Sequence, residues 1–149
     1  MKMRNFICAL VLGVLVVLTA MQVAAQDRVL TADIPFEFTV CKEQLPAGKY
    51  RIEPFSRAKP GIMIFRSEDN RSVEIVCTND LQATKLPANG KLIFNRYGNQ
   101  YFLTEMWFPG ERTGSLVTKS EREEALLREL APPKKREKVT VKVTEAKPN

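Results

Sequence analysis

Carboxylates are the side chains in this sequence best suited to hydrolytic chemistry. Asp33 and Glu37 share one face of an expected strand, where the usual rise per residue separates them by about 13 Å. The catalytic carboxylates of glycosidases lie about 5 to 9.5 Å apart, so this pair does not match that chemistry. Glu121, Glu123 and Glu124 suit the first turn of a helix. We therefore expect solvated carboxylates and no catalytic residue.

The sequence contains no histidine. This absence excludes Ser-His-Asp and Cys-His nucleophile systems and every metal site that needs a histidine ligand. Cys77 would have no histidine partner as a nucleophile, and its expected position toward the core favours an inert thiol. We expect no enzyme, no metal and no cofactor.

The residues best suited to contact a ligand are aromatic. Tyr101 and Trp107 share one face of an expected hairpin with Arg96, and an exposed row of this kind would stack on sugar rings or bind a partner protein. The alternative is that the row packs under a helix, with Arg96 lying on Tyr101 as a local cation–π pair. We favour this alternative and keep Arg96, Tyr101 and Trp107 as candidate ligand-contact residues.

Cys41 and Cys77 form the other candidate pair. The sequence has three cysteines, but Cys8 lies in the apolar N-terminal run, which we expect to be removed on export. The remaining pair in an exported chain suggests a disulfide. Alternation places Cys77 toward the core, whereas Cys41 continues the outward phase of its strand. A bridge without strain therefore requires that strand to end by Val40. We expect free thiols, with the disulfide as the alternative.

These candidates depend on the hairpin KLIFNRYGNQYFLTEMWFP, residues 91–109. Gly98 and Asn99 tolerate positive φ, as a two-residue hairpin turn requires, and β-forming runs flank them. Both faces of the hairpin are partly apolar, so other strands should cover most of it. The hairpin therefore indicates a sandwich or a barrel.

The rest of the chain also consists mainly of expected strands. Residues 30–40 alternate between apolar and polar, but Pro35 cannot donate a ladder hydrogen bond, so this strand should lie at an edge or pair on one side only near that point. Ser120 and Glu123 form a capping box that starts a helix at about 121–130. Further strands are expected at residues 49–55, 62–65, 71–78, 81–86 and 115–117. The sequence predicts a mainly β fold, a small antiparallel β-sandwich or barrel with one short C-terminal α-helix.

The N-terminus predicts export. Basic residues precede an apolar run from Phe6 to Ala20, and small residues follow at a cleavage position after Ala25. Residues 1–25 are therefore expected to be a secretory signal peptide, with an uncleaved membrane anchor as the alternative. We expect a single β domain at residues 26–133 and a periplasmic or extracellular location.

The net charge of +6 is concentrated at the C-terminus. Residues 26–133 carry 15 basic and 15 acidic side chains, whereas residues 134–149 carry six basic and two acidic ones. A neutral body argues against nucleic-acid binding. The tail is expected to be disordered, the alternative being an edge strand that contains Val139, Val141 and Val143. A disordered tail would be a solubilising segment without a partner, with weak contact to anionic surfaces as the alternative.

Four segments, ADIPFEFTV, LPAGKY, KLIFNRYGNQYFLTEMW and TKSEREEAL, resemble in that order a group of small exported proteins found mainly in acidobacterial-type soil bacteria. The resemblance covers most of residues 26–133. It implies export and one compact domain, and it carries over no activity, ligand or site residue.

Export, the absence of histidine and the neutral body together suggest a non-catalytic binding or structural module of the cell envelope or its surroundings. Its partner would be an envelope component or a polysaccharide. The alternative is a carboxylate-dependent hydrolase that acts on an extracellular polymer.

Overall fold

The computed structural model describes residues 29–56, 58–130 and 136–146; the predicted signal peptide lies outside them. Within the described residues the chain forms one helix, α2 (Glu121–Glu129), and a set of strands. The strands are β1 (Leu30–Ile34), β2 (Phe38–Val40), β3 (Glu43–Leu45), β4 (Gly48–Ser56), β5 (Lys59–Ser67), β6 (Val73–Gln82), β7 (Gly90–Tyr97), β8 (Gln100–Trp107), β9 (Thr113–Val117) and β10 (Glu137–Glu145).

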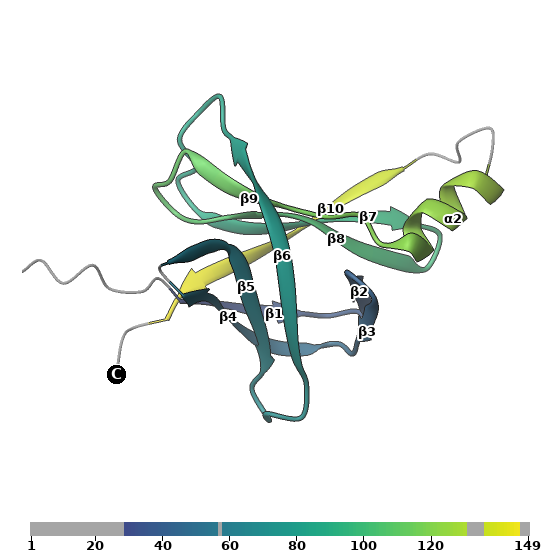
Figure 1. The fold of residues 1–149 in the computed structure, drawn as a ribbon, viewed down its shortest axis with the longest axis horizontal. Coiled ribbons are helices and arrows are strands. Elements are labelled where there is room, and N and C mark those ends of the chain that lie inside the picture. The colour runs from purple at the N-terminus through teal and green to yellow at the C-terminus, as the bar shows by residue number, and fades with distance from the viewer. Residues whose placement is uncertain (1–28, 57, 131–135, 147–149) are drawn as a thin grey trace, which may run out of the picture.

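The described strands close into an eight-stranded antiparallel barrel (Figure 1). Their order is β8-β7-β10-β1-β4-β5-β6-β9, and the barrel closes because β9 pairs with both β6 and β8. The small strands β2 and β3 continue the sheet beyond the barrel. β2 pairs with β8 at Thr39 and Phe102, and β3 pairs with β2. The predicted mainly β fold is confirmed. Of the two predicted architectures, a sandwich or a barrel, the structure is a barrel.

The core of the barrel is made by the inward residues of nearly every strand. On β1 these are Leu30, Ala32 and Ile34, as the alternation predicts. The whole buried cluster is apolar apart from the phenol of its tyrosine: Leu30, Ala32, Ile34, Phe38, Val40, Leu45, Tyr50, Ile52, Met63, Phe65, Val76, Leu92, Phe94, Leu103, Met106, Phe108, Val117 and Val143.

Pro35 divides the strand predicted at residues 30–40 into β1 and β2. β1 lies between β10 and β4, so it is not an edge strand. Its pairing with β10 stops at Ala32, whereas its pairing with β4 continues to Ile34. The one-sided pairing expected near Pro35 is therefore confirmed, because proline lacks the amide that a second ladder needs.

The C-terminal segment is a strand of the barrel, and the prediction of a disordered tail is wrong for residues 137–145. β10 lies between β1 and β7, so it is not an edge strand either. Val143 is buried in the core, and Val139 and Val141 pack against the core. These valines let the charged segment bury one face, while Lys138 and Lys142 are exposed.

Helix α2 starts where the capping box predicts. The Ser120 Oγ accepts a hydrogen bond from the Glu123 amide at 3.0 Å. The Glu123 side chain does not return to the cap, however: it is 1% exposed and accepts from the Asn95 amide at 2.9 Å and the Tyr97 hydroxyl at 3.1 Å. The solvated position predicted for Glu123 is therefore wrong, because this carboxylate attaches α2 to the outside of β7.

No helix among the described residues is long and apolar enough to span a membrane.

Candidate binding cleft

The β7–β8 hairpin has the predicted tip, but a β-bulge interrupts its register. Gly98 has a φ of 62°, which the tight turn requires. Farther from the tip, Phe94 pairs with Leu103, whereas the preceding residue, Ile93, pairs with Glu105. β8 therefore carries one extra residue at this point, and the alternation of its faces changes there.

The bulge separates Trp107 from Tyr101. Tyr101 packs against the barrel core. Trp107 lies over Gly114 of β9, where an added Cβ would be 2.6 Å from the indole ring. The predicted common row of Arg96, Tyr101 and Trp107 is therefore wrong, because the fold brings the first two together and leaves Trp107 on the other face.

The Tyr101 ring already has neighbours on it. The Arg96 guanidinium carbon lies 5.6 Å from the ring centroid. The Phe36 ring stacks on Tyr101 at a centroid distance of 3.9 Å and an interplanar angle of 14°. Of the favoured interpretation, the local cation–π pair is confirmed, but the row does not pack together under a helix, because Tyr101 packs against the core and Trp107 lies over Gly114. The Tyr101 ring is therefore not a free platform for a sugar.

Trp107 belongs to a polar cluster outside the barrel. Its Nε1 donates to Glu105 Oε2 at 2.9 Å, and the Lys138 ammonium donates to Glu105 Oε1 at 2.9 Å. Burial raises the pKa of Glu105, but the hydrogen bonds from Lys138 and Trp107 outweigh it, so the pKa lies below its ordinary value. The cluster fixes β8 to β10 and leaves no free carboxylate for chemistry.

The two cysteines have the reverse of their predicted orientations. Cys41 lies in the β2–β3 turn with a φ of 52°, and its side chain packs against the core. Cys77 is exposed, because the buried side chain of this part of β6 is Val76 rather than Ile75. Both thiols are free.

Burial raises the pKa of the Cys41 thiol, and a hydrogen bond from the backbone amide of Cys77 acts in the opposite direction. The two cysteines are therefore neighbours in space. The disulfide stays the alternative to the free thiols that the sequence predicts.

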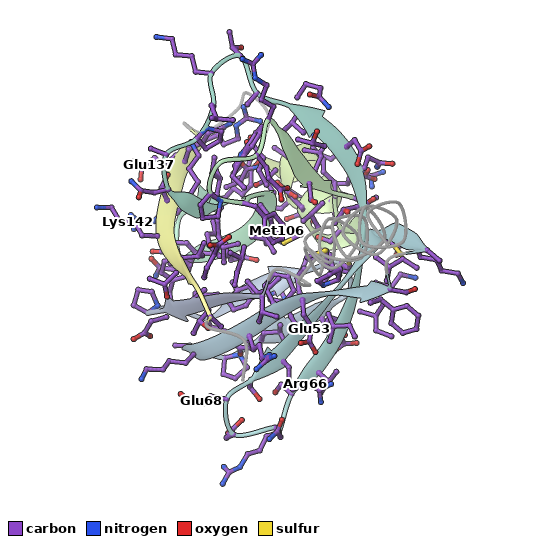
Figure 2. All side chains as sticks on the ribbon, turned by 90° about the vertical axis from the view of Figure 1, so that its left-hand side faces the viewer. Glu53, Arg66, Glu68, Met106, Glu137 and Lys142 are labelled. Atoms are coloured by element: carbon purple, nitrogen blue, oxygen red, sulfur yellow. The ribbon has the colours of Figure 1, made fainter. Side chains whose placement is uncertain are left out.

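Two hollows lined by charged residues lie outside the β4–β5 hairpin. One has a volume of about 500 Å³. The second, of about 630 Å³, lies at the β5–β6 turn and shares Lys49, Tyr50, Ser67 and Glu68 with the first. We name the first hollow the cleft; its lining residues are Thr31, Lys49, Tyr50, Arg51, Glu53, Arg66, Ser67, Glu68 and Asn70. Figure 2 shows Glu53, Arg66 and Glu68 in this part of the molecule, away from Glu137 and Lys142 on β10.

Two arginines face each other across the cleft. Arg51 on β4 is the direct register partner of Arg66 on β5, and Thr31 on β1 is the partner of Arg51 on the other side. The Arg51 Nε lies 3.1 Å from Glu53 Oε2. No hydrogen bond or ion pair joins the Arg66 side chain to any other described residue. Like charges directly opposite each other destabilise a sheet, and Glu53 offsets the charge of Arg51 but not that of Arg66.

The β5–β6 turn forms an ordered wall beside the arginines. Ser67 Oγ donates to Asp69 Oδ1 at 2.6 Å and accepts from the Ser72 amide at 2.9 Å. The hydrogen bond from Ser67, followed by that from the Arg71 amide, lowers the pKa of Asp69. The Tyr50 hydroxyl donates to the Pro46 carbonyl at 2.7 Å and holds the turn before β4 in the same way.

The cleft residues were not predicted from the sequence. One local pattern points to them, because Lys49 and Arg51 alternate with the buried Tyr50 and Ile52 on β4. That pattern places two cations outside the barrel, but it does not show that Arg66 lies beside them. Only the register of β4 with β5 supplies this third cation.

Together, the fold and the site define a small antiparallel barrel with a cationic external cleft. No family model, curated protein or solved structure matches the chain.

Proposed function

We propose that this protein is an exported, non-catalytic module that binds an anionic component of the cell envelope or its surroundings in the cleft. The observation that carries the proposal is that Arg66 lies directly opposite Arg51 and has no side-chain partner among the described residues. Export rests on the sequence of residues 1–25.

The chemistry of the arginine pair favours an anion. A guanidinium presents paired N–H donors that match the oxygens of a carboxylate, sulfate or phosphate. An anion between Arg51 and Arg66 would replace repulsion by two charge-assisted contacts. The Thr31 hydroxyl and the Asn70 amide line the same cleft and add neutral hydrogen-bonding groups. The cleft thus offers both charge and polar contacts to an acidic ligand.

The carboxylates of the cleft have structural partners, which favours binding over hydrolysis. Glu53 lies 3.1 Å from the Arg51 guanidinium. Glu68 lies 3.9 Å from the Lys49 ammonium, and both of these side chains are exposed. No observation in the described residues favours the alternative of a carboxylate-dependent hydrolase.

Binding of a soluble polyanion tests the proposal. The chain from Gln26 to Asn149 contains every described residue and would be titrated with polygalacturonate, with dextran as the neutral control, in a calorimeter. We expect salt-sensitive binding to polygalacturonate only, and about tenfold weaker binding for Arg66→Ala, the change expected when a charge-assisted contact is lost. Arg112→Ala removes the same charge from the loop between β8 and β9 and should bind like the unchanged protein.

Two results would refute the proposal. Equal affinities of Arg66→Ala and Arg112→Ala would show that the cleft is not the site. Hydrolysis of an extracellular polymer, abolished by one Asp or Glu substitution, would establish the hydrolase instead.

A further inference from the structure

A row of exposed apolar side chains continues the sheet face that carries the arginines. Val73 is 50% exposed and Ile75 is 54% exposed, both on β6. Val73 is the direct partner of Arg66, and Ile75 is the direct partner of Ile64. Direct partners lie on the same face of an antiparallel pair. We name this surface the β4–β6 face, made of Arg51, Glu53, Ile64, Arg66, Val73 and Ile75.

Nothing in the described chain covers the β4–β6 face. The outward phase of β6 continues from Val73 and Ile75 to the exposed Cys77. On β4, Phe55 is 50% exposed, but the register of β4 with β5 shifts between Pro54 and Ser56, so Phe55 is not counted in the face. Exposed apolar side chains that gather on one face, rather than scatter singly, indicate an interaction surface.

We propose that the β4–β6 face docks on an anionic lipid surface. This inference rests on the proposed function and specifies its ligand as the head groups of a lipid layer. Arg51 and Arg66 would bind head-group phosphates, while the neighbouring Ile64, Val73 and Ile75 enter the boundary between head groups and acyl chains. Buried apolar area and attraction to anionic lipids together determine how strongly a protein binds at that boundary.

The close mixture of charged and apolar side chains on the face favours a lipid surface. Arginine is itself enriched in protein interfaces, so Arg66 alone fits either kind of partner. Arg66 lies directly beside Val73, in the row that begins at Thr31. A lipid head group satisfies both neighbours, because its phosphate and its acyl chain lie next to each other.

Sedimentation with vesicles tests the inference. The chain from Gln26 to Asn149 would be mixed with vesicles of phosphatidylcholine alone or with phosphatidylglycerol added. We expect binding to the anionic vesicles only, and weaker binding in high salt. Ile75→Ser should weaken vesicle binding about fivefold, because a half-exposed isoleucine gains about half of its transfer energy on insertion. Val73→Ser should act in the same direction.

Matched variants control for charge, hydrophobicity and folding. Leu86→Ser removes an apolar side chain of similar exposure, 56%, outside the face, and Arg112→Ala removes a charge outside it. Both should bind vesicles like the unchanged protein. Ile75 and Val73 point outward, so their serine variants should keep the thermal unfolding midpoint; a loss of vesicle binding at an unchanged midpoint supports the docking role.

The polygalacturonate titration separates failure of the inference from failure of the proposed function. If polygalacturonate binds and anionic vesicles do not, the lipid inference is wrong while the proposed function stands. Equal binding to neutral and anionic vesicles, or an Ile75→Ser variant that binds like Leu86→Ser, also overturns it. Self-association that Ile75→Ser abolishes, without vesicle binding, would assign the face to a second copy of this chain. If neither ligand binds, both proposals fail.

Discussion

Replacing Val143 by alanine tests whether the basic C-terminal segment is a structural part of the barrel. Val143 is 6% exposed and belongs to the core cluster. Its register partners are Ala32 on β1 and Gly90 on β7. A disordered tail would leave the free energy of unfolding unchanged, whereas a strand between β1 and β7 should not.

The expected loss follows from the groups removed and from what surrounds them. Val143→Ala deletes two buried carbons, each of which contributes about 0.8 kcal/mol by transfer from water. A Cβ added at Gly90 would lie 2.5 Å from a Val143 methyl carbon, so the valine packs directly on glycine backbone. Small neighbours cannot fill the gap, and a cavity term adds to the transfer term. We expect a total loss of about 2 to 3 kcal/mol.

Urea unfolding measures this loss through the fluorescence of Trp107, the single tryptophan of the chain, which is nearly buried. Thr144→Ala changes the exposed neighbour of Val143 and should stay within about 0.5 kcal/mol of the unchanged protein. Equal unfolding free energies for the two variants would refute the assignment of β10 to the barrel. A chain that ends at Pro133 should lose cooperative unfolding, because β1 and β7 would then have open edges.

Three further predictions concern polar groups. Glu123→Ala leaves two buried donors of β7 without an acceptor, and urea unfolding should show a loss of about 2 to 4 kcal/mol; a loss below about 1 kcal/mol would contradict this anchoring role. Burial opposes ionisation of Glu105, but the hydrogen bonds led by that from Lys138 lower its pKa below 4.5. The stability that ionised Glu105 contributes to the fold is therefore present above pH 4.5 and is lost as the pH falls through the pKa of the folded state. Glu105→Gln should therefore flatten the fall of the melting temperature in that pH range. An unchanged slope would count against the lowered pKa. With oxidised glutathione, we expect Cys41 and Cys77 to form a disulfide within one chain and to escape alkylation, as measured by mass; two alkyl adducts would show that they do not bridge.

Local patterns were sufficient to predict the parts of the fold that depend on near neighbours in sequence. The tip at Gly98 follows from turn chemistry, and the cap at Ser120 follows from one side chain that binds an amide three residues away. The inward face of β1 follows from alternation, because its other phase is polar. In each of these three cases the local sequence is compatible with only one favourable local structure.

β6 shows where alternation fails. Val73, Ile75 and Cys77 form one apolar phase, but the other phase contains Val76, and the barrel buries Val76. A shift of one residue reverses every face of a strand, so the choice depends on the neighbours of β6 rather than on its own sequence. The bulge in β8 escaped prediction for a related reason, since an extra residue is defined only against the partner strand.

The structure of the tail and the position of the cleft both depend on strand pairing, which the local sequence of charged residues does not show. β10 has the charge pattern of a solvated segment, and its valines face the core only because it pairs with β1 and β7. Likewise, Arg51 and Arg66 are separate surface cations in the sequence and become an opposed pair only through the register of β4 with β5. Because like charges so placed oppose folding, the register that creates the pair also supplies the physical reason to look for an anion between them.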